Sequence, residues 1–205
     1  MATRKKQATI NITALFLLLA GCAANEEVIP VITEKRIEQA SATVSNQQDH
    51  KQSSEKGIIP VQIVVPSLDI EANVESVGLT DDGTMELPSD DKLTAWYENG
   101  AQPGENGNSV IAGHVDNKTG PAVFFRLKDI KPGEEVIVYG KDGEELTFVV
   151  QDKKAYPYDD APLPSIFGFS QEKKLNLITC TGTFDRKKKT HLERLVVSAK
   201  LKETS

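Results

Sequence analysis

Residues 135–151 read EVIVYGKDGEELTFVVQ, and this stretch sets the class of the fold. Two runs rich in β-branched and aromatic residues, 135–139 and 146–151, flank a turn that contains Asp142-Gly143. An Asp-Gly pair between such runs is a strong hairpin signal, because glycine readily adopts the positive φ that the tight turn requires. The stretch therefore predicts two adjacent antiparallel strands.

Similar short runs lie on both sides of this hairpin. The further strands that the pattern predicts are 61–65, 68–77, 109–112, 175–180 and 192–201. Helix-like pieces are confined to 92–96 and 121–127. A closed or partly closed β-barrel is a natural way to protect so many short strands, so an all-β domain with short helices is expected over residues 58–205.

The first 21 residues have the layout of a secretory signal peptide. A basic Arg4-Lys5-Lys6 segment precedes an apolar run over 10–19, which is shorter than the roughly 18 residues that a membrane-spanning helix needs. The ending Leu-Ala-Gly-Cys resembles a bacterial lipobox, in which Cys22 would be lipidated and become the new N-terminus. An ordinary signal peptide in which Cys22 is incidental is the alternative.

Residues 22–57 are expected to form a lipidated N-terminus followed by a flexible tether. The stretch 23–57 has no aromatic residue and is rich in Glu, Gln, Ser and Lys, so it cannot bury enough apolar area to fold. The expected organisation is a signal peptide (1–21), a tether (22–57) and one domain (58–205). Lipid anchoring would place that domain on the outer face of the cytoplasmic membrane.

Composition excludes several classes of protein. The chain has a net charge of −6, and removal of the basic leader makes it more acidic still. Nucleic acid is therefore not an expected partner, because its binding normally needs a basic face. The chain has two cysteines, one of them in the leader, which excludes a multi-disulfide scaffold and a structural zinc site. No cofactor or metal is expected.

Three residues at strand ends are candidates for chemistry. Cys180 ends the apolar run LNLITC, His114 follows Ile-Ala-Gly, and Arg194 points away from the inward Leu195 and Val197. Taken singly, they are a buried apolar cysteine, a core or surface histidine and a solvated arginine. Taken together, they suit cysteine-based acyl transfer, which needs an activated thiol, an oxyanion donor and a proton donor for the leaving amine.

The sequence resembles the sortases, cysteine transpeptidases of Gram-positive cell surfaces, and most closely class F sortases. The resemblance runs in order through residues 58–203. The matching stretches are AWY (95–97), QPGENGNSVIAGHVD (102–116), GPAVF (120–124), LITCTGTFD (177–185) and RLVV (194–197).

This resemblance implies a closed eight-stranded sortase barrel and a mechanism. Cys180 would attack the Thr-Gly carbonyl of an LPXTG-type sorting signal, Arg194 would stabilise the oxyanion, and His114 would act as general acid and base. A thioacyl enzyme would then pass its acyl group to an amine of a cell-wall precursor. The implied partners are the sorting-signal peptide of surface proteins, that amine acceptor and, through the lipid, the membrane.

The resemblance also implies a peptide groove. Ala112, Ile178 and Thr179 match sortase groove positions, and alternation places Ile178 on the face of Cys180 and Ala112 on that of His114. The loop over 157–171 is expected to be either an apolar lid for the sorting signal of the substrate or a proline-stiffened surface loop.

Three further residues lie near the candidate site in the sequence. Asn176 stands where sortases usually have the first Thr of Thr-Leu-x-Thr-Cys, on the face of Cys180. His191 is expected on the strand face opposite Arg194 and is given no catalytic part. Asp116 either orients His114 or caps a turn.

Other functions remain open or are excluded on sequence. The Ser/Thr-His-Gly-Cys run of L,D-transpeptidases and the Cys-Gly-x-Cys-Trp run of papain-like proteases are absent. The open alternatives are a lipid-anchored β-barrel that binds peptides or cell wall without catalysis, and a sortase-like hydrolase. The basic run 186–189 is either a solvated loop or a device that steers an anionic precursor.

Overall fold

The computed structural model describes residues 56–203, in which eight strands close into a barrel. The order around the barrel is β1-β2-β3-β4-β7-β8-β6-β5. The strands are β1 (Pro60–Val65), β2 (Ile70–Val77), β3 (Thr94–Tyr97), β4 (Gly107–Gly113), β5 (Glu135–Gly140), β6 (Glu145–Pro157), β7 (Lys173–Asp185) and β8 (Thr190–Leu201). The predicted all-β class with a closed eight-stranded barrel is confirmed.

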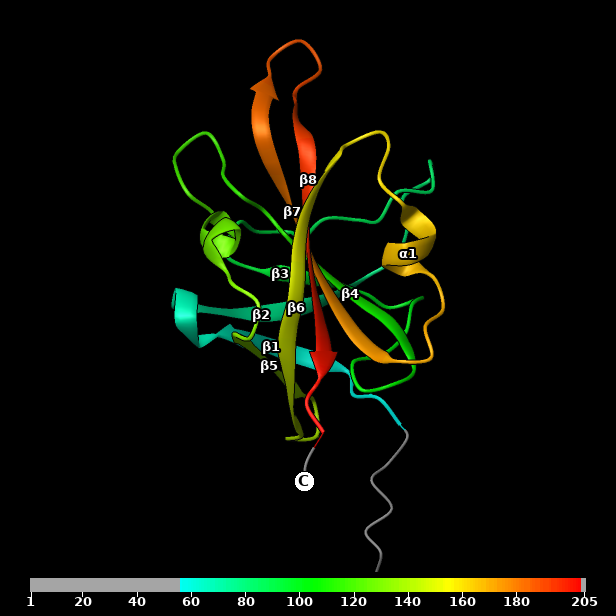
Figure 1. Cartoon of the computed structure of the whole chain (residues 1–205). Helices are drawn as coiled ribbons and strands as arrows, with labels where there is room; N and C mark the ends of the chain where they lie inside the picture. Colours follow the sequence, from blue (N-terminus) through cyan, green and yellow to red (C-terminus); the bar gives the residue numbers. More distant parts are fainter. Residues whose placement is uncertain (1–55, 204–205) are drawn as a thin grey trace, which may run out of the picture. The chain divides into compact units, whose positions relative to one another are not determined.

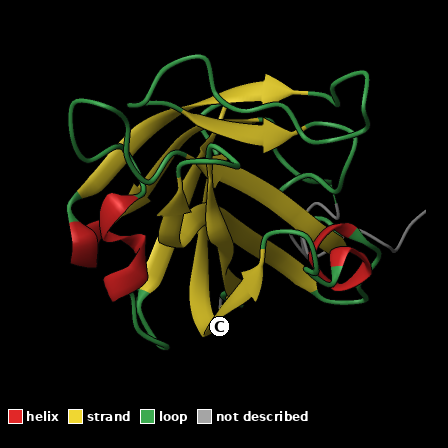
Figure 2. Cartoon of the chain, turned by 90° about the horizontal axis from the view of Figure 1, so that it is seen from above, coloured by secondary structure: helices red, strands yellow, loops and turns green. Residues whose placement is uncertain are grey.

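The helical segments are short and lie at the periphery of the barrel (Figure 2). They are the 3₁₀-helices η1 (Pro66–Leu68) and η2 (Phe125–Asp129) and the single helix α1 (Leu163–Phe167). Among residues 56–203, no helix is long and apolar enough to cross a membrane. The expected signal peptide, Cys22 and the tether up to residue 55 lie outside the described residues.

Most strand pairs are antiparallel, and two are parallel. The β5–β6 hairpin closes at the predicted Asp142-Gly143 turn, where Gly143 has a φ of 89°. The parallel pairs are β2–β3 and β4–β7. Figure 1 shows the β7–β8 hairpin extending beyond the rest of the barrel, so the outer ends of these two strands pair only with each other.

Three predicted elements differ from the observed ones. The segment 92–96 is not helical, because Thr94–Tyr97 forms β3 between β2 and β4 and buries Trp96 in the core. Pairing with two neighbouring strands outweighs local preference at this position. The helix expected over 121–127 is reduced to η2, and the loop 157–171 contains α1.

The barrel interior is filled by side chains from every strand. Its largest fully buried members include Phe124, Phe148, Ile111, Leu175 and Leu177. Every residue of β4 is buried, since one face of this strand meets the interior and the other lies under α1. The strand that leads to His114 is therefore held on both faces.

We predict that Phe148→Ala lowers the free energy of unfolding by about 3–5 kcal/mol, because it removes a fully buried ring from the core. Urea unfolding measures the change. Phe169 is 80% exposed, so Phe169→Ala is the matched control and should change stability by no more than about 0.5 kcal/mol. Equal losses in both variants would contradict this picture of the core.

Candidate active site

Strand register brings the three candidate residues together. In the parallel β4–β7 pair, Ala112 lies opposite Ile178, so continuing each strand by two residues places His114 beside Cys180 on the same face. In the antiparallel β7–β8 pair, Cys180 lies directly opposite Arg194. Neighbouring strands are about 4.8 Å apart, so the three residues form a row across three adjacent strands.

These residues line one cleft at the end of the barrel. The cleft has a volume of about 470 Å³. Its lining includes Leu87, His114, Val115, Asp116, Asn117, Lys118, Cys180, Phe184, Lys189, Thr190, His191 and Arg194. The wall thus combines apolar, cationic and acidic side chains.

Backbone contacts fix His114 at the end of β4. The Phe124 amide donates a hydrogen bond to the His114 carbonyl (2.9 Å). The hydroxyl of Thr179, which is buried, donates to the carbonyl of Gly113 (2.8 Å). A Cβ on Gly113 would lie 2.6 Å from the Phe124 ring, so only glycine allows this approach. His114 is therefore anchored to both the core and β7.

The thiol of Cys180 is half-buried, and burial raises its pKa above the ordinary value. The positive charge of Arg194 opposes this rise, and the negative charge of Asp116 adds to it. The resting cysteine is therefore mainly a thiol at neutral pH. A proton acceptor such as His114 is needed to turn it into a nucleophile.

Arg194 is held in place by its own strand and by a tyrosine. Its Nη1 atom donates to the carbonyls of His191 (3.0 Å) and Glu193 (3.1 Å). Its Nη2 atom donates to Thr190 Oγ1 (3.1 Å), and the guanidinium carbon lies 5.8 Å from the centre of the Tyr158 ring. These contacts leave further N–H groups of the guanidinium for an oxyanion.

The three predicted groove residues, Ala112, Ile178 and Thr179, lie on two different faces of the β4–β7 pair. Ala112 and Ile178 are register partners on the outer face, in line with His114 and Cys180. Thr179 points the other way, and its side chain is bonded to Gly113 rather than directed into the cleft. Any substrate contact of Thr179 would therefore come from its backbone.

Asn176 lies on the outer face, as alternation predicted, and holds α1 against the barrel. Its side-chain amide donates to the Ile166 carbonyl (2.8 Å) and to Asn108 Oδ1 (3.3 Å). Asn108 in turn donates to the Gly168 carbonyl (2.7 Å). The two amides thus fix both the last turn of α1 and the residue after it.

The geometry decides against one of the two options for Asp116 and corrects the expectation for His191. Asp116 accepts a hydrogen bond from His191 (3.1 Å), and His114 is not its partner. His191 lines the cleft together with Arg194 instead of facing away from it. A β-bulge between Thr181 and Phe184 changes the register there, and bulges increase twist and redirect side chains.

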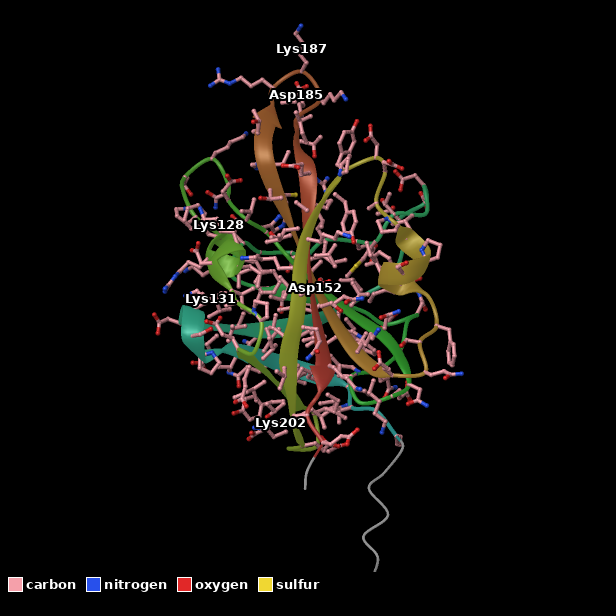
Figure 3. All side chains as sticks on the ribbon, in the orientation of Figure 1. Lys128, Lys131, Asp152, Asp185, Lys187 and Lys202 are labelled. Carbon is pink, nitrogen blue, oxygen red and sulfur yellow. The ribbon has the colours of Figure 1, made fainter. Side chains whose placement is uncertain are left out.

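Two further residues, Tyr158 and Thr190, contact Arg194, and the sequence did not indicate this. Neither sits in a motif, and only the long β6–β8 pairing brings the end of β6 to this side of the barrel. The basic run is divided: Lys189 lines the cleft, Lys188 contacts the Tyr158 ring, and Lys187 lies at the hairpin tip (Figure 3).

Comparison with known proteins identifies the domain. A family model described as the sortase domain matches residues 63–202. A search of the curated proteins found no match.

Solved structures with the same fold are distant in sequence. Sortase A from Corynebacterium diphtheriae has a TM-score of 0.57 and 20% identity, with 75% of this chain and 65% of that chain covered. A complex of Streptococcus agalactiae sortase C1 with MTSET has a TM-score of 0.55 and 18% identity, covering 70% and 67%. Sortase C from Clostridium perfringens has a TM-score of 0.53 and 20% identity, covering 73% and 72%. The chain thus spans just under two thirds of the Corynebacterium protein.

We predict that Asn176→Leu loosens α1, because the Ile166 carbonyl and Asn108 each lose a buried hydrogen-bond partner. The expected cost is about 1–3 kcal/mol in the free energy of unfolding, with faster amide hydrogen exchange over residues 163–168. Gln171→Leu, an amide-to-leucine change at an exposed position, is the control and should leave both quantities unchanged. Unchanged exchange in the Asn176 variant would show that the two amides do not hold α1.

Proposed function

This chain belongs to the sortase family, and on that premise we propose that it is a cysteine transpeptidase, closest to class F sortases, that cleaves an LPXTG-type sorting signal between Thr and Gly. The observation that carries the proposal is the shared cleft of His114, Cys180 and Arg194. A binding barrel without catalysis has no need for a thiol, an imidazole and a guanidinium in one row.

The first half of the reaction forms a thioacyl enzyme. His114 accepts the Cys180 proton, and the sulfur attacks the carbonyl carbon of Thr, so that a C–S bond forms and the carbonyl oxygen becomes negative. Arg194 donates hydrogen bonds to that oxygen. When the tetrahedral intermediate collapses, the Thr–Gly C–N bond breaks, and His114 gives its proton to the departing glycine amine.

The second half transfers the acyl group. An amine of a cell-wall precursor attacks the thioester carbonyl, and His114 now accepts the amine proton. Collapse of this second intermediate forms the new amide bond and releases the Cys180 sulfur, which recovers its proton. The Cys180 thiolate takes this proton back from His114, which restores the starting thiol. Burial of Cys180 favours that protonated form.

We place the sorting-signal peptide of the substrate along the outer face of β4 and β7, from the cleft toward α1. Ala112 and Ile178 would form its floor, since they continue the row of His114 and Cys180 along β4 and β7. The Asn108–Asn176 pair sets the height of α1 above that floor. Asn176 would thereby influence which residues of the sorting signal fit.

The test uses the full chain with quenched peptides that span LPXTG and close variants, with and without triglycine. We expect cleavage between Thr and Gly and, by intact-mass measurement, a thioacyl adduct on Cys180. Cys180→Ala should abolish both signals, while His114→Ala and Arg194→Ala should each lower the rate by about 10²-fold or more.

The product distinguishes the alternatives. A triglycine adduct supports transpeptidation, and a free carboxylate even with triglycine present indicates a hydrolase. Peptide binding with no adduct on any sequence would instead favour a barrel that binds without catalysis.

We also propose that the chain is an exported lipoprotein, with residues 1–21 as signal peptide, lipid on Cys22 and residues 22–57 as tether. The domain over 58–205 would then act on the outer face of the cytoplasmic membrane. Support comes from the lipobox-like ending and from the absence of aromatic residues in 23–57.

We expect Cys22→Ala to move the protein, expressed in a Gram-positive host, from the detergent phase to the aqueous phase on phase partition, because the lipid chains supply the membrane affinity. Asn25→Ala, which keeps the cysteine, is the control and should partition like the unchanged protein. A Cys22 variant that remains in the detergent phase would contradict lipid anchoring.

A further inference from the structure

The cleft contains a second histidine, which the mechanism above does not use. His191 lies on β8 with a side chain that is only 13% exposed. Its Nε2 atom lies 3.1 Å from Asp116 Oδ1, and its Nδ1 atom lies 3.1 Å from the carbonyl oxygen of Gly182. The Phe184 ring packs against the imidazole, with 5.2 Å between ring centroids.

These contacts join the three segments that carry the proposed catalytic residues. Asp116 follows His114 by two positions, and Gly182 follows Cys180 by two positions. The backbone carbonyl of His191 accepts the hydrogen bond from Arg194 Nη1. One residue therefore contacts the segment after β4 and the outer part of β7 with its ring, and the Arg194 guanidinium with its backbone.

Both partners of the ring are hydrogen-bond acceptors. A carboxylate and a backbone carbonyl only accept hydrogen bonds, so both ring nitrogens face acceptors. A neutral imidazole has one N–H and would leave its other nitrogen against an oxygen lone pair. A doubly protonated ring would donate to both oxygens and form an ion pair with Asp116.

The Asp116 carboxylate affects the pKa of the Cys180 thiol. The charge of Asp116 raises the pKa of Cys180, in the same direction as burial and against the effect of Arg194. A protonated His191 at 3.1 Å from Asp116 would offset that charge. Without the offset, the carboxylate would act on the thiolate undiminished.

We propose that His191, paired with Asp116, is a positioning residue of the active site: it fixes the His114 loop to the β7–β8 hairpin and compensates the carboxylate charge next to Cys180. This inference rests on the proposed function in that Cys180 is the nucleophile. The opposing possibility is a purely structural staple that leaves the thiol unaffected. The charged and titratable groups that line the cleft are His114, Asp116, Lys118, Cys180, Lys189, His191 and Arg194.

The experiment measures how fast iodoacetamide alkylates Cys180 in the full chain between pH 6 and pH 10, by quantifying the Cys180-containing peptide with mass spectrometry. The rate follows the thiolate fraction and needs no sorting-signal peptide. His191→Gln keeps the size of the side chain and removes its charge. We expect its profile to move to higher pH, with alkylation at pH 7 slower by about threefold.

Asp116→Asn is the second variant and should have the opposite effect, with alkylation at pH 7 faster by about threefold. When Asp116→Asn is already present, His191→Gln should change the rate much less, because no carboxylate charge remains for His191 to compensate. Lys187→Gln removes a charge at the hairpin tip, away from the ion pair, and should leave the profile unchanged.

Two results would overturn the proposal. One is a His191→Gln profile that coincides with that of the unchanged protein. The other is an equal effect of His191→Gln with and without the Asp116 carboxylate. Circular dichroism checks folding, and Asp116→Asn tests the charge effect even if the histidine variant does not fold. Failure of peptide cleavage would remove the proposed function and leave this alkylation result intact.

Discussion

The parallel pairing of β4 with β7 is the constraint on which the candidate active-site cleft depends. Its register places Ala112 opposite Ile178, and hence His114 beside Cys180. The hydrogen bond from Thr179 to the Gly113 carbonyl holds the two strands together one residue before the histidine. Because side chains alternate along a strand, a slip of one residue would turn either His114 or Cys180 to the opposite face and abolish the site.

Much of the fold follows from local patterns, and the exceptions have physical causes. The Asp142-Gly143 hairpin and most strands follow from alternation and turn residues. Strand β3 does not, because four residues carry too little periodicity and its stability comes from two partner strands. Helix α1 has only five residues, and amide groups supplied by β4 and β7 hold it in place.

The candidate site, like the fold, follows only in part from patterns in the sequence. The positions of Cys180 and Arg194 on one face follow from alternation along regular strands, and sequence resemblance indicates His114. Regular pairing of β7 with β8 would turn His191 away from the face of Arg194, whereas a bulge in β7 opposite it changes the register. Gly182, with a φ of 74°, lies at this bulge and is the one signal in the sequence that marks it.

The partial burial of Cys180 also affects how fast its thiol is oxidised. Oxidation by peroxide proceeds through the thiolate, so a cysteine that keeps its proton at neutral pH oxidises slowly. Within residues 56–203 Cys180 is the only cysteine, and no second thiol there can trap a sulfenic acid as a reversible disulfide. The burial that keeps the proton on the Cys180 thiol thus also slows its oxidation.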